Sequence, residues 1–289
     1  MIRSLEEPFV LRNRVKMPCV GYGTYLEEGG EAYRSVYHAL KAGYRLIDTA
    51  SLYKNEKEVG KAVARFLEEE EELKRSDLFI TSKLWNADRG YDKTMAAFDK
   101  TLENLGLEYL DLYLIHWPAN TRQFAPEEAK KLNQETWRAL EDLYLSGRVR
   151  AIGVSNFLKH HIEDLYETAR IEPMVDQLEF HPGWLQYETV SFCKEKGILV
   201  EAWSPLGRTT IFSDKTINKI ANAHNVSVAQ VCLRFCLQHD VLPIPKSVHE
   251  SRMKANLDLF GFTLTAEEMA ALDGLSNMGG NHDPDTVEF

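Results

Sequence analysis

The segments 44–48 (YRLID), 77–83 (DLFITSK) and 109–116 (YLDLYLIH) share one pattern that decides the fold. Each begins polar, continues as an apolar run, and ends at an aspartate, a lysine or a histidine. Continuously apolar strands are typical of a parallel sheet that is covered on both faces. Because the carboxyl ends of parallel strands meet at one side of the sheet, the pattern indicates an active site there.

Strand-like and helix-like segments alternate along the rest of the chain. We expect strands over 20–23, 45–48, 78–83, 110–115, 149–154, 174–178, 199–202 and 242–245. We expect amphipathic helices over 31–41, 56–73, 93–105, 127–145, 159–168, 187–196, 214–224, 227–238 and 267–272. Several helical patterns are followed directly by glycine and then a strand, as at Gly106, and glycine there ends a helix cleanly. Eight strand–helix units predict an α/β fold, a (β/α)8 TIM barrel.

An open doubly wound sheet is the alternative architecture. The segment 21–26 (GYGTYL) follows the first strand but lacks the third glycine of a G-x-G-x-x-G dinucleotide-binding motif. The barrel is therefore favoured.

The chain shows no internal repeat or linker that would divide its 289 residues, so we expect one domain over 1–289. A short β-hairpin is expected over about 9–19, before the barrel, and a C-terminal tail over about 276–289. The polar stretch 119–133 fits either a substrate lid or an inert insertion, because loops after barrel strands build the rim of the site.

Charge and composition exclude several classes of partner. There are 34 basic and 44 acidic residues, a net charge of −10, whereas nucleic acids and anionic membranes require a basic surface. No segment has the length of a signal peptide's apolar region or of a bilayer span. We therefore expect a cytoplasmic monomer that acts on a small molecule.

The cysteines and histidines show no metal-site spacing, and we expect no metal. The four cysteines are spread along the chain and are expected to be reduced thiols in or near the core. His160 and His161 are adjacent and His181 stands alone, so the sequence shows no ligand set for a metal-dependent barrel hydrolase.

The polar residues at the strand ends form a proton-handling set. In a barrel, Asp48, Lys83 and His116 would face one another across the mouth, with Tyr53 from the loop after Asp48. Free tyrosine titrates near ~10, and a nearby ammonium lowers that pKa. Asp48 would keep Lys83 charged, and His116 would either orient a substrate oxygen or relay a proton. Such a set suits the protonation of a carbonyl oxygen that receives a hydride, although each residue alone also fits a turn, surface or packing role.

Eight short motifs resemble those of the aldo-keto reductases, in order from about residue 10 to about residue 275. They are DTA (48–50), YKNE (53–56) with VG (59–60), SKLW (82–85), LIHWP (114–118), GVSNF (153–157), QLEFHP (177–182), SPLG (204–207), and IPKSV (244–248) with Arg252 and Asn256.

The resemblance implies an oxidoreductase that reversibly reduces aldehydes and ketones with NADPH. It implies a catalytic tetrad of Asp48, Tyr53, Lys83 and His116, with Tyr53 as the proton donor. It also implies that NADPH/NADP+ binds across the barrel mouth. The matching cofactor positions are Gly23, Thr24, Asp48, Ser155, Asn156, Gln177, Trp203, Ser204, Leu206, Gly207, Lys246, Ser247, Val248, Arg252 and Asn256.

The resemblance gives some of these positions a specific role. Trp203 matches an aromatic residue that stacks on the nicotinamide. Lys246, Ser247 and Arg252 match the 2′-phosphate site, and two cations with a hydroxyl suit a dianionic phosphate. Ala255 departs from the family pattern, in which Glu or Gln is common, so one adenine contact is missing.

The substrate end is expected to be aromatic. Tyr25, Trp85 and Trp117, with His116, suit a compact and partly apolar carbonyl compound. The short tail resembles the bacterial and protozoan branch, such as 2,5-diketogluconate and methylglyoxal reductases and prostaglandin F synthases, and implies an open site with broad specificity. The alternative function is a cofactor-binding regulatory or interaction subunit on the same barrel.

Overall fold

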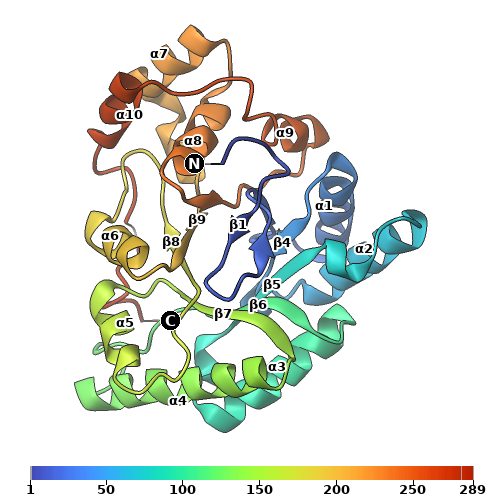
Figure 1. Ribbon diagram of the computed structural model, residues 1–289, viewed down its shortest axis with the longest axis vertical. Coiled ribbons are helices and arrows are strands. Elements are labelled where there is room, and N and C mark those ends of the chain that lie inside the picture. Colours follow the sequence, from blue (N-terminus) through green and yellow to red (C-terminus); the bar gives the residue numbers. More distant parts are fainter. Residues whose placement is uncertain (1, 281, 289) are drawn as a thin grey trace.

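Eight parallel strands form the centre of the computed structural model, which describes residues 2–280 and 282–288, and helices surround them (Figure 1). Neighbouring strands follow chain order from β3 to β10, and all seven pairs are parallel. The strands are β3 (Gly21–Gly23), β4 (Leu46–Asp48), β5 (Phe79–Leu84), β6 (Leu110–Ile115), β7 (Val149–Ser155), β8 (Val175–Glu179), β9 (Leu199–Trp203) and β10 (Leu242–Pro243). The eight predicted strands and the barrel are confirmed.

Ten α-helices occur among the described residues, mostly between successive strands. They are α1 (Gly29–Ala42), α2 (Glu56–Glu69), α3 (Tyr91–Leu105), α4 (Pro126–Leu145), α5 (Lys159–Tyr166), α6 (Tyr187–Glu195), α7 (Lys215–His224), α8 (Val228–Gln238), α9 (Glu250–Ala255) and α10 (Ala266–Asp273). Short 3-10 helices are η1 (Ser51–Tyr53), η2 (Arg75–Asp77), η3 (Asn86–Asp88) and η4 (Gly207–Ser213). Gly106 ends α3 in the left-handed conformation, φ 64°, as the sequence predicts.

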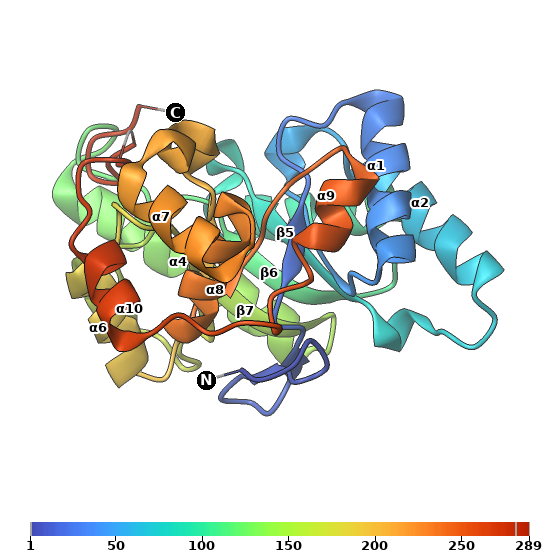
Figure 2. The same cartoon turned by 90° about the horizontal axis from the view of Figure 1, so that it is seen from above.

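The barrel closes between its first and last strands without a regular ladder in the described residues. The Gly23 amide donates to the Pro245 carbonyl at 3.1 Å across this seam. A Cβ on Gly21 would lie 2.6 Å from Ile244 Cγ2 and 2.5 Å from Leu46 Cδ2, too close for any larger residue. The glycine at position 21 therefore permits the close approach that closes the barrel. Helix α9 consequently lies beside α1 (Figure 2).

The predicted hairpin is confirmed and covers the amino-terminal end of the barrel. Strand β1 (Phe9–Val10) pairs antiparallel with β2 (Lys16–Met17). Its turn contacts the barrel through Asn13, whose side-chain amide donates to the Arg150 carbonyl at 2.9 Å. The hairpin therefore lies at the end opposite to the predicted site (Figure 2).

Two helical predictions differ from the structure. Helix α2 ends at Glu69 and not at residue 73, because its last turn holds no basic residue and leads into a run of glutamates at the negative end of the helix dipole. Helix α9 was not predicted, since only Met253 and Ala255 of its six residues are apolar and they show no amphipathic pattern. The helix predicted over 127–145 is confirmed as α4, which begins at Pro126, since proline suits a first helical turn, and so takes in the second half of the polar stretch 119–133.

The remaining loop, 119–125, is tied to its surroundings. Asn133 of α4 bonds both the amide and the carbonyl of Ala119, at 2.7 and 3.0 Å. The Asn120 side chain donates to the Pro284 and Val287 carbonyls of the C-terminal tail.

The four cysteines are free and buried, as expected. No helix within the described ranges is long and apolar enough to cross a membrane.

Candidate active site

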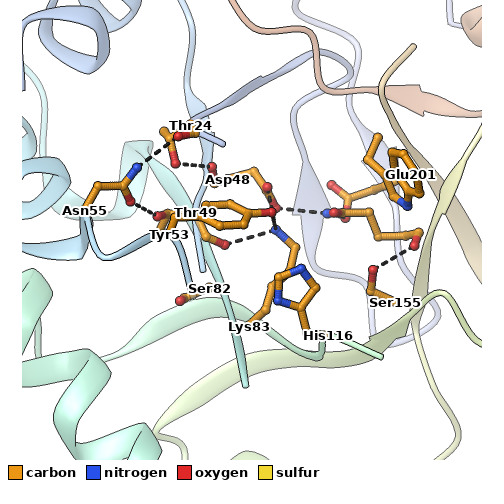
Figure 3. A network of polar contacts seen from close by, with 12 residues as sticks. Thr24, Asp48, Thr49, Tyr53, Asn55, Ser82, Lys83, His116, Ser155 and Glu201 are labelled. Atoms are coloured by element: carbon orange, nitrogen blue, oxygen red, sulfur yellow. Dashed lines mark hydrogen bonds and ion pairs between the residues drawn. The ribbon is translucent and has the colours of Figure 1, made fainter. Parts of the chain in front are cut away.

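The four residues of the predicted tetrad lie together at the carboxyl ends of β4, β5 and β6 (Figure 3). The Lys83 ammonium donates to Asp48 Oδ1 at 2.6 Å, to the Thr49 carbonyl at 3.0 Å and to the Tyr53 hydroxyl at 3.4 Å. Three acceptors use all three donors of an ammonium group. Lys83 is fully buried, so Asp48 supplies the countercharge that makes burial of a cation tolerable.

The pKa values of Lys83 and Tyr53 show which charges the site prefers. Burial disfavours the Lys83 ammonium, but Asp48 and Tyr53 outweigh that effect and raise its pKa. Burial raises the pKa of Tyr53, and the neighbouring Lys83 only partly opposes this. We expected the Lys83 ammonium to bring the pKa of Tyr53 below its ordinary value. That prediction is wrong, because the effect of burial is larger and the pKa is raised. Tyr53 keeps its proton at neutral pH and is ready to donate it.

His116 is a neutral ring at this site. Burial, and then the Lys83 charge, hold its pKa well below the usual range. Its ring edge packs against Tyr53 and Trp85, with centroids 5.7 and 5.3 Å apart. Its Nδ1 has no hydrogen-bond partner within the described residues. Among the described residues, no protein group can therefore pass a proton to or from that nitrogen, which favours an orienting role over a relay.

A cavity of about 630 Å³ opens above these residues. Fourteen of the predicted site residues line it: Gly23, Tyr25, Asp48, Tyr53, Trp85, His116, Trp117, Ser155, Asn156, Gln177, Trp203, Ser204, Leu206 and Lys246. The three aromatic residues of the expected substrate end are among them.

Polar side chains at the carboxyl ends of β7 and β9 form one hydrogen-bonded group in the cavity wall, anchored on the backbone of β8. The Trp203 indole donates to Asn156 Oδ1 at 2.8 Å, and Asn156 Nδ2 donates to Ser155 Oγ at 3.0 Å. Ser155 Oγ donates to the Gln177 carbonyl at 2.8 Å. This chain of bonds fixes the Trp203 ring, the Asn156 amide and the Ser155 hydroxyl relative to one another.

Several predicted residues do not reach the cavity. Thr24 is buried beneath it and donates through Oγ1 to the Asp48 carbonyl at 3.0 Å. The others outside the lining are Lys83, Gly207, Ser247, Val248, Arg252 and Asn256. Asn256 is buried, and Ser247 Oγ accepts from the His249 amide.

Two exposed cations lie on the segment that follows β10. Lys246 lines the cavity, and Arg252 lies on α9. Neither side chain forms a contact ion pair with a carboxylate in the described part of the chain, although the Lys246 charge acts on the buried Glu27. Their positive charge is therefore available to an anion.

Other cavity residues were not predicted from the sequence, and three of them bear polar groups: Arg208, Thr209 and His282. The Arg208 guanidinium lies 5.9 Å from the centroid of the Trp203 ring. It directly follows the SPLG motif, so its place in the sequence was an available signal. The His282 ring packs edge-on against Trp117 at 6.2 Å, but it comes from the tail, and no local pattern indicated that contact.

The fold also gathers His160, His161 and Asp285, a potential ligand set that the sequence does not show. Both Nε2 atoms face Asp285 Oδ1, at 2.9 and 3.2 Å. His161 Nδ1 accepts from the Leu158 amide at 3.1 Å, so the neutral ring carries its proton on Nε2. That nitrogen is a donor to Asp285 and not a metal ligand. The three residues are best described as a clasp that holds the tail to α5.

Residues 20–277 match the model of the aldo/keto reductase family. The chain belongs to the aldo/keto reductase family. A glyoxal reductase of Bacillus subtilis is 48% identical over 293 residues, with 100% of both chains covered. A 9,11-endoperoxide prostaglandin H2 reductase of Trypanosoma cruzi is 44% identical over 95% of this chain and 94% of its own.

Solved structures show the same family resemblance. A mutant of Gox0644 in complex with NADPH is 38% identical, with a TM-score of 0.88 over 98% of both chains. This aldo/keto reductase is therefore an oxidoreductase on a TIM barrel, as the sequence motifs imply.

Proposed function

We propose that this aldo/keto reductase uses NADPH to reduce a small aldehyde or ketone to an alcohol, and catalyses the reverse reaction. The observation that carries the proposal is the buried Lys83, which contacts both Asp48 and the Tyr53 hydroxyl below an aromatic-walled cavity. Relatives in this family include a structure with NADPH and a Bombyx mori aldo-keto reductase in complex with NADP, 33% identical with a TM-score of 0.86.

The groups around the cavity suit NADPH. Ser155, Asn156 and Gln177 offer donors and acceptors for a carboxamide, and Trp203 offers an aromatic face for its ring. Lys246 and Arg252 form no contact ion pair in the described chain and are exposed, and two cations favour a 2′-phosphate over a neutral hydroxyl. When bound, NADPH supplies the hydride.

Tyr53 acts as the general acid in reduction. A carbonyl oxygen within reach of the phenol gains negative charge as the carbon is reduced, and the phenol transfers its proton to that oxygen. Lys83 stabilises the phenolate that remains, and Asp48 keeps Lys83 charged and directed toward Tyr53. Neutral His116 orients the oxygen by a hydrogen bond, since its ring lines the cavity beside Tyr53.

Small aldehydes, including dicarbonyl compounds, are the substrate class that we favour. Tyr25, Trp85 and Trp117 form an apolar wall around the proposed reaction centre, and the relative with 48% identity is named a glyoxal reductase. His282 closes part of the wall from the tail. We further propose a cytoplasmic monomer organised as one domain over 1–289, for which sedimentation of the purified protein tests the oligomeric state.

The variant Tyr53→Phe tests the assignment. It removes the hydroxyl but keeps the ring, so NADPH-dependent reduction of glyoxal should fall by about 10²-fold or more, while NADPH binding should change little. Retained turnover would contradict Tyr53 as the acid. A wild-type protein that binds NADPH but reduces no carbonyl compound in a substrate panel would instead support the alternative role of a regulatory or interaction subunit.

A further inference from the structure

Glu201 is a buried acid in the barrel interior that the proposed mechanism does not use. Glu201, labelled in Figure 3, lies on β9 in register with Gln177 of β8, so the two side chains project from the same face of the sheet. Both are buried, and Asp48 approaches the same amide from β4. Glu201 therefore lies beneath the cavity, next to the ion pair of the tetrad.

The Gln177 amide nitrogen is fully engaged by carboxyl groups. Nε2 donates to Asp48 Oδ2 at 2.9 Å and to Glu201 Oε2 at 3.2 Å. A primary amide has two N–H groups, so neither is left for another acceptor. The reversed amide would place a carbonyl oxygen against the Asp48 carboxylate, which repels it. Gln177 lines the cavity, and its carbonyl oxygen Oε1 is the only polar side-chain atom left to face a ligand.

We propose that Glu201 is a positioning residue for the cofactor amide: together with Asp48 it holds both N–H groups of Gln177, so that Gln177 presents its carbonyl oxygen to the cavity. A ligand that carries a primary amide then binds with its N–H group toward Gln177. This inference rests on the proposed function, because nicotinamide is the amide-bearing ring concerned.

The protonation state of Glu201 is compatible with this hydrogen bonding to Gln177. Burial, followed by the nearby Asp48 charge, raises the pKa of Glu201 to about 8, so the carboxyl group is mostly protonated at neutral pH. Its Oε1 atom has no hydrogen-bond partner in the described residues, and a neutral carboxyl tolerates that better than a carboxylate does. While Glu201 is protonated, Asp48 and Lys83 are the charged groups beneath the cavity, and their charges balance. Ionisation at alkaline pH adds a second negative charge there.

Two substitutions of Glu201 separate the hydrogen bond from the charge. Glu201→Met removes the acceptor, whereas Glu201→Gln keeps a carbonyl that can accept from Gln177. Asp176→Asn is the matched control: Asp176 is also fully buried, on β8, and contacts Cys193 at 3.8 Å instead of the cavity residues. Circular dichroism and thermal melting check the fold of each variant.

Binding of NADPH, followed by quenching of tryptophan fluorescence at neutral pH, is the first measurement. We expect Glu201→Met to bind NADPH about five- to tenfold more weakly, because the Gln177 amide loses one of the two hydrogen bonds that hold it. Glu201→Gln should stay within about twofold of wild type. Asp176→Asn should bind as wild type does. Equal binding by wild type and Glu201→Met would overturn the inference, and so would a Glu201→Gln variant as weak as Glu201→Met.

The second measurement does not depend on the methionine variant. Between about pH 6.5 and about pH 9.5, the wild type should shift its preference toward NADP+ over NADPH by about threefold or more, because the oxidised ring is cationic. Glu201→Gln cannot ionise and should lack this shift. Coinciding profiles would overturn the charge effect. A wild-type protein that bound neither nucleotide would instead refute the proposed function.

Discussion

Lys83 Nζ lies 2.6 Å from Asp48 Oδ1, and both side chains are almost completely shielded from solvent. A buried ion pair is weak evidence for stability, because the cost of desolvation offsets much of the attraction. The pair has a clearer consequence for chemistry. It places a permanent cation beside the Tyr53 hydroxyl, where a phenolate forms after proton transfer.

Removing only one charge of the Lys83–Asp48 pair should lower the free energy of unfolding more than removing both charges. We expect Lys83→Met to lower the free energy of unfolding by about 3–5 kcal/mol, because it leaves Asp48 buried without a countercharge. The double variant Lys83→Met/Asp48→Asn should recover part of that loss. Urea denaturation of both variants and of wild type measures the difference. A double variant less stable than the sum of the single variants would contradict the pairing.

The pH dependence of reduction should follow the raised pKa of Tyr53. The acid form of Tyr53 donates the proton, and its pKa lies above the ordinary value because burial disfavours the phenolate. Reduction should therefore be insensitive to Tyr53 through neutral pH and should fall only as the pH rises through this raised pKa. The profile of kcat/KM for glyoxal with saturating NADPH tests this. A decline that begins below about pH 8 in both wild type and Glu201→Gln would contradict the assignment.

Arg252 should decide the preference for NADPH over NADH. Its guanidinium is exposed on α9 and has no ion-pair partner in the described chain. Arg252→Gln should weaken NADPH binding by about tenfold to a hundredfold, the range for loss of a charge-assisted bond, with little effect on NADH. Lys254→Gln removes an exposed cation from the same helix and is the control. Equal losses for both nucleotides would argue against a 2′-phosphate contact.

The sequence predicted the barrel because three strands are apolar runs that end at a polar residue and because strand-like and helix-like segments alternate along the chain, and both patterns are local. The tetrad was predictable for the same reason: Asp48, Lys83 and His116 each end or follow one of those runs. Motif positions placed Trp203 and Lys246 in the cavity correctly. What the sequence could not show depends on contacts between distant segments.

Glu201 and His282 illustrate that limit. Glu201 lies inside an apolar strand pattern, and its effect on Gln177 requires the strand register to be known. His282 reaches the cavity only because the tail returns across α5 and the loop 119–125. The net pKa shift of Tyr53 was also inaccessible, since it depends on how deeply the phenol is buried and not only on its charged neighbour.

The clasp formed by His160, His161 and Asp285 should release the tail at acidic pH. Burial lowers the pKa of His161, an effect that the bond to Asp285 opposes and the nearby His160 reinforces. A group whose folded-state pKa is depressed in this way favours the docked tail above its ordinary pKa, near ~6.5, and opposes docking as the pH falls and the proton binds. The pKa of Asp285 is also lowered, so its contribution is lost only at still lower pH.

Hydrogen exchange measures this release. Between about pH 7 and about pH 5, after correction for intrinsic exchange rates, protection of residues 282–288 should decrease while that of α8 stays constant. His161→Asn removes the titrating ring and should abolish the pH dependence, whereas His224→Asn, at an unrelated His–Glu pair between α7 and α10, should retain it. Because His282 lines the cavity, release should also raise KM for glyoxal in wild type but not in His161→Asn. A tail equally protected at both pH values would show that the clasp does not titrate in this range.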